Sequence, residues 1–247
     1  MVHEAASVGF SRSAEAYDRA RPEYPAAAIE RFCVAVGIDR GSRVLDVGAG
    51  TGKLTAPLAE RGVEVVAVEP VAEMRERIAG RAPGTVAVDG VAEHLPADDG
   101  QADAIVAGQA FHWFANERAL AEFARCLRRA GRLGLIWNRR SSDDALQRRI
   151  TALLDPVRGN APRHAAGAWR EAFERPGPFE PLDGFELEFV QELDRDGLLD
   201  RVGSVSFVAA LEPERRSGVL AQVAELCPEA STVELTYVCE AFVYGRA

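Results

Sequence analysis

The stretch Val44-Leu45-Asp46-Val47-Gly48-Ala49-Gly50-Thr51-Gly52 places a short apolar run, three glycines and the expected start of a helix in direct succession. Glycine tolerates a positive φ and leaves no Cβ in the way of a ligand. A helix that begins directly after such a turn presents free backbone N–H groups. This order predicts a strand over 43–47, a tight turn and a helix over 51–60 that together can receive a ligand.

The alternation of strand and helix continues along the first half of the chain. Further strands are expected over 63–68, 85–88, 102–107 and 132–137, and helices over 25–37, 71–78 and 116–129. Strands that alternate with helices imply right-handed crossovers and a parallel sheet. We therefore expect an α/β fold, a doubly wound Rossmann-like parallel sheet with a final antiparallel strand and helical additions.

Three regions of the chain have different expected roles. Residues 1–40 are expected to form an N-terminal arm and helix that act as a lid, and residues 41–139 the core that binds the cofactor. Residues 140–247 are expected to supply a helical cap insertion and the last two strands of the sheet. The predicted elements of this last region are helices over 141–154, 197–208 and 212–226, a short helical piece around Trp169, and strands over 185–193 and 233–244.

Charge and composition exclude several classes of partner. The 247-residue chain carries a formal net charge of −9, and its Lys and Arg residues are scattered. A nucleic-acid ligand or a membrane surface would favour a basic face, so neither is expected. No apolar stretch has the length of a membrane span, and no secretory signal is visible at the N-terminus. The four cysteines form no CxxC pair, which indicates buried, reduced thiols in a cytoplasmic protein without a metal site.

A carboxylate after the second expected strand narrows the choice of ligand. Glu69 lies 69 − 48 = 21 positions after Gly48, the spacing at which a carboxylate can accept hydrogen bonds from both ribose hydroxyls of an adenosine. The dinucleotide pattern GxGxxG requires glycine where this chain has Lys53. The phosphate-loop pattern GxxxxGK[ST] fails as well, because Lys53 is followed by Leu54.

The acid that precedes the glycines is evidence against a pyrophosphate ligand. Asp46 would repel a phosphate but would attract an ammonium group. The methionine part of S-adenosylmethionine carries such a group, so its amino group is the expected partner of Asp46.

Five segments together resemble class I S-adenosylmethionine-dependent methyltransferases, in particular the small-molecule branch that includes trans-aconitate methyltransferase-like proteins. The segments are 17–25, 44–55, 69–70, 89–96 and 102–114. The resemblance implies S-adenosylmethionine as cofactor, S-adenosylhomocysteine as product, no metal, and methyl transfer to an oxygen, carbon or nitrogen atom of a small-molecule acceptor, with a carboxylate as one option. The chain departs from the family pattern at Val91, where an Asp that binds the adenine amino group is common.

The resemblance and the motifs give a set of expected site residues. Cofactor-binding residues are expected to be Tyr17, Arg21, Tyr24, Asp46, Gly48, Ala49, Gly50, Glu69, Pro70, Met74, Ala92, Glu93, Gln109 and Ala110. The acceptor pocket is expected to contain Phe111, His112, Trp113, Trp137 and Asn138. His112 as general base and Gln109 are the expected catalytic residues, since a histidine titrates near neutral pH.

Two other functions stay open at this point. A non-catalytic protein that binds S-adenosylmethionine for regulation would carry the same motifs, and a nicotinamide-dependent oxidoreductase is disfavoured by Lys53 and Asp46. The DNA amino-methyltransferases of this fold carry an Asp/Asn-Pro-Pro-aromatic run where this chain has Gly108-Gln109-Ala110-Phe111, and the acidic cluster of cation-dependent catechol-type enzymes is missing there. The oligomeric state is expected to be a monomer or a homodimer.

Overall fold

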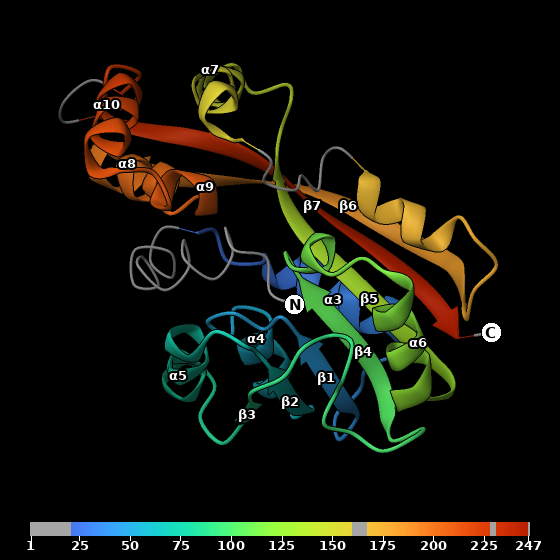
Figure 1. Cartoon of the computed structure of the whole chain (residues 1–247). Coiled ribbons are helices and arrows are strands. Elements are labelled where there is room, and N and C mark those ends of the chain that lie inside the picture. Colours follow the sequence, from blue (N-terminus) through green and yellow to red (C-terminus); the bar gives the residue numbers. More distant parts are fainter. Residues whose placement is uncertain (1–20, 160–166, 228–230, 247) are drawn as a thin grey trace.

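The computed structural model describes residues 21–159, 167–227 and 231–246, so Tyr17 lies outside the described residues. Its centre is a seven-stranded sheet of order β3-β2-β1-β4-β5-β7-β6 (Figure 1). The strands are β1 (Arg43–Val47), β2 (Glu64–Val68), β3 (Val86–Val88), β4 (Ala102–Gly108), β5 (Leu127–Arg140), β6 (Phe179–Asp194) and β7 (Thr232–Arg246). β1 to β5 pair in parallel, and β7 runs antiparallel to β5 and β6. The doubly wound Rossmann-like fold predicted from the sequence is confirmed.

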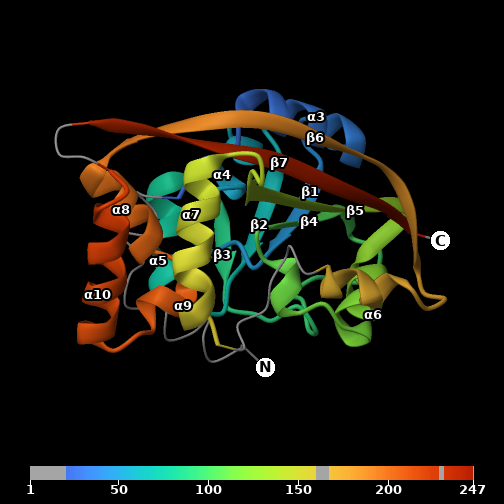
Figure 2. The same cartoon turned by 90° about the horizontal axis from the view of Figure 1, so that it is seen from above.

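Helices cover both faces of the parallel part of the sheet (Figures 1 and 2). They are α3 (Ala26–Val36), α4 (Thr55–Ala59), α5 (Ala72–Arg81) and α6 (Glu117–Cys126). Strand side chains alternate between the faces. Val44 therefore packs in one core cluster with α3 and α4, whereas Leu45 packs in the other with Phe123 of α6. Burial on both faces explains why the strands read as nearly continuous apolar runs in the sequence.

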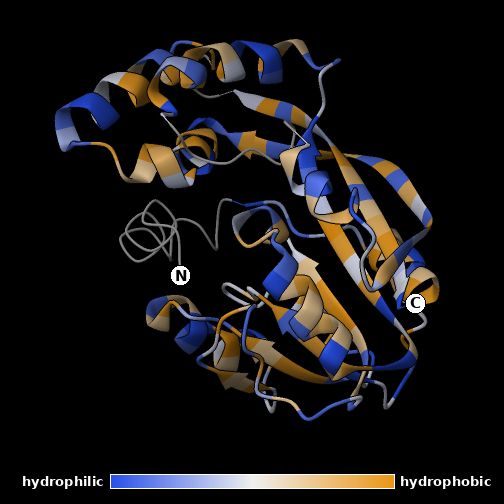
Figure 3. Ribbon diagram, turned by 45° about the vertical axis from the view of Figure 1, so that its right-hand side comes forward, coloured by the Kyte–Doolittle hydropathy of each residue, from blue (hydrophilic) through white to orange (hydrophobic). Residues whose placement is uncertain are grey.

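A helical cap lies beside the end of β6 and the start of β7, the two long strands (Figure 3). Its helices are α7 (Ala145–Leu154), α8 (Arg195–Gly203), α9 (Ser206–Ala209) and α10 (Pro213–Ala224). Short 3-10 helices also occur. η1 (Phe111–Trp113) follows β4, and η2 (Asp155–Val157) and η3 (Ala168–Phe173) lie between α7 and β6 in the sequence. The cap has its own apolar cluster, which includes Leu154, Leu198 and Val223 together with Tyr237 of β7. The strands thus continue from the core into the cap and connect the two.

Several helix boundaries differ from the sequence prediction. The helix expected over 116–129 ends at Cys126, because Leu127 already pairs with Ala102 as the first residue of β5. The helix expected over 51–60 begins only at Thr55, because positions 51–54 belong to the turn. The segment expected to form one helix over 197–208 forms two helices, α8 and α9. The first of them begins earlier than expected, because the Asp194 side chain caps α8 by accepting a hydrogen bond from the backbone of Gly197 at 2.7 Å.

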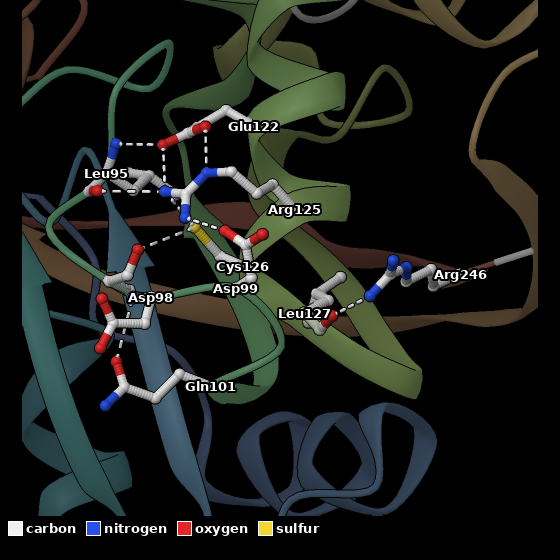
Figure 4. Close-up of polar contacts among 10 residues, drawn as sticks. Leu95, Asp98, Asp99, Gln101, Glu122, Arg125, Cys126, Leu127 and Arg246 are labelled. Carbon is white, nitrogen blue, oxygen red and sulfur yellow. Dashed lines mark hydrogen bonds and ion pairs between the residues drawn. The ribbon is translucent and has the colours of Figure 1, made fainter.

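A network of charged residues holds the loop between β3 and β4 against α6 (Figure 4). Glu122 accepts hydrogen bonds from Arg125 at 2.7 and 2.8 Å and from the backbone N–H of Leu95 at 2.7 Å. Arg125 also pairs with Asp99 at 2.8 Å. The hydrogen bonds from Arg125, ahead of the opposing effect of burial, lower the pKa of Glu122. The loop between β3 and β4 is therefore fixed to the C-terminal turn of α6, close to the start of β4.

Candidate functional site

The glycine turn after β1 has the backbone that its sequence predicts. Gly48, Gly50 and Gly52 have φ values of +70°, +59° and +87°, a region that other residues rarely adopt. A Cβ at Gly48 would lie 2.8 Å from the Cβ of Ala110, whereas a Cβ at Gly50 would meet no atom within 4 Å. Gly48 is therefore required by packing against the loop after β4, and the space beside Gly50 is open to a ligand.

Asp46 is fully buried at the end of β1 and borders this turn. Its Oδ2 accepts a 2.6 Å hydrogen bond from the hydroxyl of Thr55, while Oδ1 has no hydrogen-bond partner among the described residues. Burial, partly offset by the Thr55 hydrogen bond, raises the pKa of Asp46 to about 7. A buried carboxylate oxygen without a donor is costly, so this atom is prepared for a cationic or hydrogen-bonding ligand.

Glu69 ties the second strand to the glycine turn. Its two carboxylate oxygens accept hydrogen bonds from the backbone N–H groups of Gly50 and Val71, at 2.8 and 2.9 Å. Burial raises the pKa of Glu69, and these hydrogen bonds act in the opposite direction. The 21-residue spacing recognised in the sequence thus corresponds to direct contact between the acid and the turn.

A pocket extends from the glycine turn to the cap. It is lined by Arg21, Pro22, Tyr24, Asp46, Gly48, Ala49, Gly50, Thr51, Lys53, Leu54, Gly108, Gln109, Asn138 and Arg201. The segment 21–24 crosses one side of it. Lys53 and Arg81 both pair with Glu23, at 2.5 and 3.1 Å, and Arg21 donates to the backbone oxygen of Ser204 in the cap at 3.4 Å. The N-terminal segment therefore contacts both the glycine turn and the cap.

Gln109 and Asn138 form the floor of the pocket at the ends of β4 and β5. Gln109 has a φ of +59°, which is unusual for a residue other than glycine. Its backbone N–H donates to Ile136 at 2.9 Å and its side-chain amide to the backbone oxygen of Asn138 at 3.2 Å. The Asn138 amide donates to the backbone oxygen of Glu23 at 3.2 Å, and its buried Oδ1 has no partner among the described residues. Two buried acceptors, Asp46 Oδ1 and Asn138 Oδ1, thus belong to one pocket.

The aromatic residues after β4 lie mainly in a core cluster. Phe111 is fully buried and packs against Phe114, Phe123, Trp169 and Phe173. Trp137 is also buried and stacks on Trp169, with ring centroids 4.9 Å apart. These side chains do not belong to the lining of the pocket described above.

His112 and Trp113 lie at the edge of that cluster. The two rings are 5.0 Å apart, and the indole N–H of Trp137 donates to Nδ1 of His112 at 3.4 Å. A neutral histidine whose Nδ1 accepts a hydrogen bond carries its proton on Nε2. Of the two residues expected to act on the acceptor, Gln109 lines the pocket, whereas His112 contacts Trp137 beside it.

The remaining expected cofactor residues lie along the ends of β2 and β3. Pro70 directly follows Glu69, and Met74 of α5 and Ala92 are buried. Glu93 accepts a 3.1 Å hydrogen bond from the side chain of Asn116, which caps α6. Where the family pattern has an Asp, Val91 forms a bridge to His94.

Two arginines near the cap, Arg201 and Arg140, were not expected from the sequence as site residues. Arg201 of α8 lines the pocket and donates from Nε to the hydroxyl of Tyr237 at 2.9 Å. Arg140, the last residue of β5, is the Cα partner of Tyr237 across the antiparallel pair. No local pattern marked these residues, because the contact joins segments that are distant in the sequence.

Metal-binding clusters and membrane-spanning helices are both absent from the described part of the chain. No group of three or more His, Cys, Asp or Glu residues there could hold a metal ion. None of its helices combines the length and the apolar character needed to cross a bilayer. The four cysteines are buried, and no disulfide joins them.

The comparisons with known proteins agree with this geometry. Residues 45–135 match a family model described as a methyltransferase domain. An uncharacterized methyltransferase of Mycobacterium tuberculosis is 38% identical over 224 residues, which covers 89% of this chain and 86% of that protein. This chain belongs to the methyltransferase family.

Other relatives of this methyltransferase extend the comparison. An uncharacterized methyltransferase-like protein of Schizosaccharomyces pombe is 33% identical over 221 residues, covering 89% of this chain and 86% of that protein. A solved structure from Anaeromyxobacter dehalogenans, assigned as a type II methyltransferase, is 26% identical with a TM-score of 0.66 and covers 92% of this chain and 97% of its own. Geranyl diphosphate C-methyltransferase of Streptomyces coelicolor shares the fold, with a TM-score of 0.50 and 15% identity. The match covers 90% of this chain and 79% of that chain, and that structure was solved with Mg²⁺, geranyl diphosphate and S-adenosylhomocysteine.

Proposed function

We propose that this methyltransferase transfers the methyl group of S-adenosylmethionine to an oxygen, carbon or nitrogen atom of a small-molecule acceptor. The observation that carries the proposal is the free Oδ1 of Asp46, a fully buried acceptor beside the glycine turn and in the same pocket as Asn138. A structural neighbour with the same fold was solved with S-adenosylhomocysteine bound, which supports the choice of cofactor.

The residues of the site fit each part of this cofactor. Asp46 would accept hydrogen bonds from the ammonium group of the methionine part, and a carboxylate in a buried site binds a cation strongly. Glu69, next to the open space at Gly50, would hold the ribose hydroxyls. Arg21 borders the pocket and would pair with the methionine carboxylate. The same proposal assigns contacts with the ribose, adenine and methionine parts to Tyr24, Gly48, Ala49, Pro70, Met74, Ala92, Glu93 and Ala110.

S-Adenosylmethionine, when bound, supplies a methyl group made electrophilic by the sulfonium. The protein then has to hold the acceptor atom in line with that methyl and to exclude water. Gln109 is suited to this positioning role, because its unusual backbone conformation is held by hydrogen bonds at both its N–H and its side chain. Asn138 Oδ1, which has no donor among the described residues, would accept a hydrogen bond from the acceptor or from the cofactor.

The buried aromatic residues would act less directly. We assign to Phe111 and Trp137 the role of a rigid wall behind the acceptor side of the pocket, and to His112 and Trp113 the role of its edge. His112 would act as a hydrogen-bond donor through Nε2 while its Nδ1 accepts from Trp137. The role of general base that was expected for His112 from the sequence would require that contact to change first.

Calorimetric titration tests the proposal. S-Adenosylmethionine, S-adenosylhomocysteine and NAD are titrated into wild type, Glu69→Ala and Glu69→Gln, with Glu64→Ala as control. Glu64 is exposed at the other end of the same strand, so its loss should leave binding unchanged. We expect both sulfur ligands to bind wild type, at least about tenfold more weakly in Glu69→Ala, and NAD not to bind.

The glutamine variant separates local folding from binding. It retains one oxygen, which can accept a hydrogen bond from the backbone N–H of Gly50, and it should bind the sulfur ligands with intermediate affinity. Binding of NAD alone, or of none of the three ligands to wild type, would overturn the proposed function.

A further inference from the structure

Positively charged side chains gather where the cap meets the sheet. Arg140 and Tyr237 are directly opposed on β5 and β7, so their side chains lie on the same face of the sheet. Arg201 reaches the same place from α8 of the cap, with its guanidinium carbon 5.6 Å from the centroid of the Tyr237 ring. The two arginines therefore flank one tyrosine, although they come from distant parts of the chain.

Arg201 is the best-defined member of this group. Its side chain is only 4% exposed and borders the pocket that also contains Asp46 and Gln109. Nε donates to the Tyr237 hydroxyl, but Nη1 is buried and has no hydrogen-bond partner among the described residues. A buried charged donor without an acceptor is strongly unfavourable, which points to a ligand that supplies the acceptor.

Positive charge dominates the electrostatics around Tyr237. Burial and then the nearby charge of Arg201 lower the pKa of Arg140 to about 9, so its guanidinium still carries its charge at neutral pH. Burial would raise the pKa of Tyr237, yet the positive charges of Arg201 and Arg140 outweigh it and the pKa is lowered. Glu23, an acid of the adjoining segment, is already engaged by Lys53 and Arg81.

We infer that Arg201 and Arg140, on either side of Tyr237, bind an anionic group of the acceptor, a carboxylate or a phosphate ester. Guanidinium groups bind both kinds of oxyanion through charge-assisted hydrogen bonds. This inference rests on the proposed function and names its acceptor class. The cofactor brings a single carboxylate, which the proposed function assigns to Arg21 on the lining of the pocket. A second anion would therefore bind at Arg201 and Arg140.

The experiment uses the full chain saturated with S-adenosylhomocysteine, so that the cofactor carboxylate is already in place. Succinate, citrate and inorganic phosphate are titrated as probes, with glycerol as an uncharged comparison, and binding is followed by calorimetry. Arg201→Gln and Arg140→Gln are compared with wild type and with Arg149→Gln. Arg149 is an exposed arginine on α7 of the same cap, so its variant removes the same charge away from the site.

We expect at least one of the anions to bind wild type and Arg149→Gln with equal affinity, and at least about tenfold more weakly to Arg201→Gln and Arg140→Gln. Preference for the carboxylates or for phosphate would identify the anionic group. The affinity for S-adenosylhomocysteine should stay within about twofold in all variants. Arg140→Gln guards against loss of folding in Arg201→Gln, because Arg140 keeps more exposed surface than Arg201.

Three results would count against the inference. Anion binding that is absent, or that is equal in all four proteins, would overturn it while leaving the cofactor site intact. Loss of S-adenosylhomocysteine binding in Arg201→Gln would instead assign this arginine to the cofactor carboxylate. Failure of wild type to bind S-adenosylhomocysteine at all would overturn the proposed function itself, and the titration distinguishes this case directly.

Discussion

Replacing Asp46 by Asn should stabilise the ligand-free protein and weaken cofactor binding at the same time. Asp46 is fully buried, and its pKa is raised to about 7 because burial disfavours the charged form. In the unfolded chain an Asp titrates at about 3.9. Between these two values the folded state holds the proton more tightly, so the free energy of unfolding falls as pH rises from about 4 to about 7.

The size of this effect follows from the difference between the two pKa values. Each pH unit of that window corresponds to about 1.4 kcal/mol, so the ionised Asp46 destabilises the ligand-free fold by about 4 kcal/mol above pH 7 at most. Asn carries no charge and can still accept the hydrogen bond of Thr55. We expect urea unfolding at pH 8 to show Asp46→Asn more stable than wild type by about 2–4 kcal/mol, and the difference to vanish near pH 4.

Asp103→Asn is the matched control because the same substitution there should act with the opposite sign. Asp103 accepts a 2.8 Å hydrogen bond from the backbone of Arg43 and a 2.6 Å bond from Arg128, and its pKa is lowered, first by the backbone hydrogen bond. Its ionised form stabilises the fold above the pKa of the unfolded state, and this contribution is lost as pH falls through the lower folded pKa. If Asp46→Asn destabilised the protein at pH 8 as Asp103→Asn does, the burial argument would be wrong.

Cofactor binding gives the second half of this prediction. An ammonium group held by Asp46 requires the ionised carboxylate, so the affinity of wild type for S-adenosylmethionine should rise between pH 6 and pH 8, with proton release on binding. The affinity of Asp46→Asn should be at least about tenfold lower at pH 8 and nearly independent of pH. Titrations in buffers of different ionisation enthalpy measure the released proton, and unchanged affinity in the variant would refute the role of Asp46.

Three further substitutions test the turn, the loop and the strained residue. Gly48→Ala places a Cβ 2.8 Å from a neighbouring side chain and should destabilise the fold by about 1–3 kcal/mol in urea unfolding, more than Gly50→Ala, which shares the positive φ but meets no atom. Glu122→Gln removes the charge that binds the neighbouring arginine and should cost about 1 kcal/mol at pH 7. Because the pKa of Glu122 is lowered in the folded state, this cost should be complete above the pKa of the unfolded state and should be lost as pH falls through the lower folded pKa. Gln109→Gly and Ala130→Gly both relieve a positive φ and should be stable to within about 1 kcal/mol of wild type, but only the first should lower methyl transfer. Equal turnover in these last two variants would remove Gln109 from the site.

The sequence was sufficient for the parts of the molecule that local patterns determine. Gly48, Gly50 and Glu69 were recognisable because a tight turn, an open approach and a carboxylate at a fixed distance along the chain have to occur together. The strands of the parallel sheet were recognisable because burial on both faces makes them apolar throughout. Both features depend on residues that are close in the sequence.

Other features depend on contacts between distant segments, and the sequence could not predict them. The end of α6 at Cys126 is set by the pairing of Leu127 with Ala102 on another strand. The aromatic run after β4 has the same composition whether it lines a pocket or a core, and only the structure shows that Phe111 packs against Phe173. Tertiary packing, rather than local preference, decides such cases.

In the proposed function and the inference drawn from it, the cofactor and the acceptor would be recognised by parts of the chain with different constraints. The matched methyltransferase domain, residues 45–135, contains Asp46 and Glu69 but neither Arg140 nor Arg201. Arg140 is placed by the register of β5 on β7, and a slip of one residue would move Tyr237 to the opposite face of the sheet. The register therefore has to be retained for the two arginines to meet, whereas the side chains at these positions can change without disturbing the glycine turn. Relatives that share the turn can thus differ in their acceptors. A comparison of the residues at positions 140, 201 and 237 would indicate which relatives accept an anionic molecule.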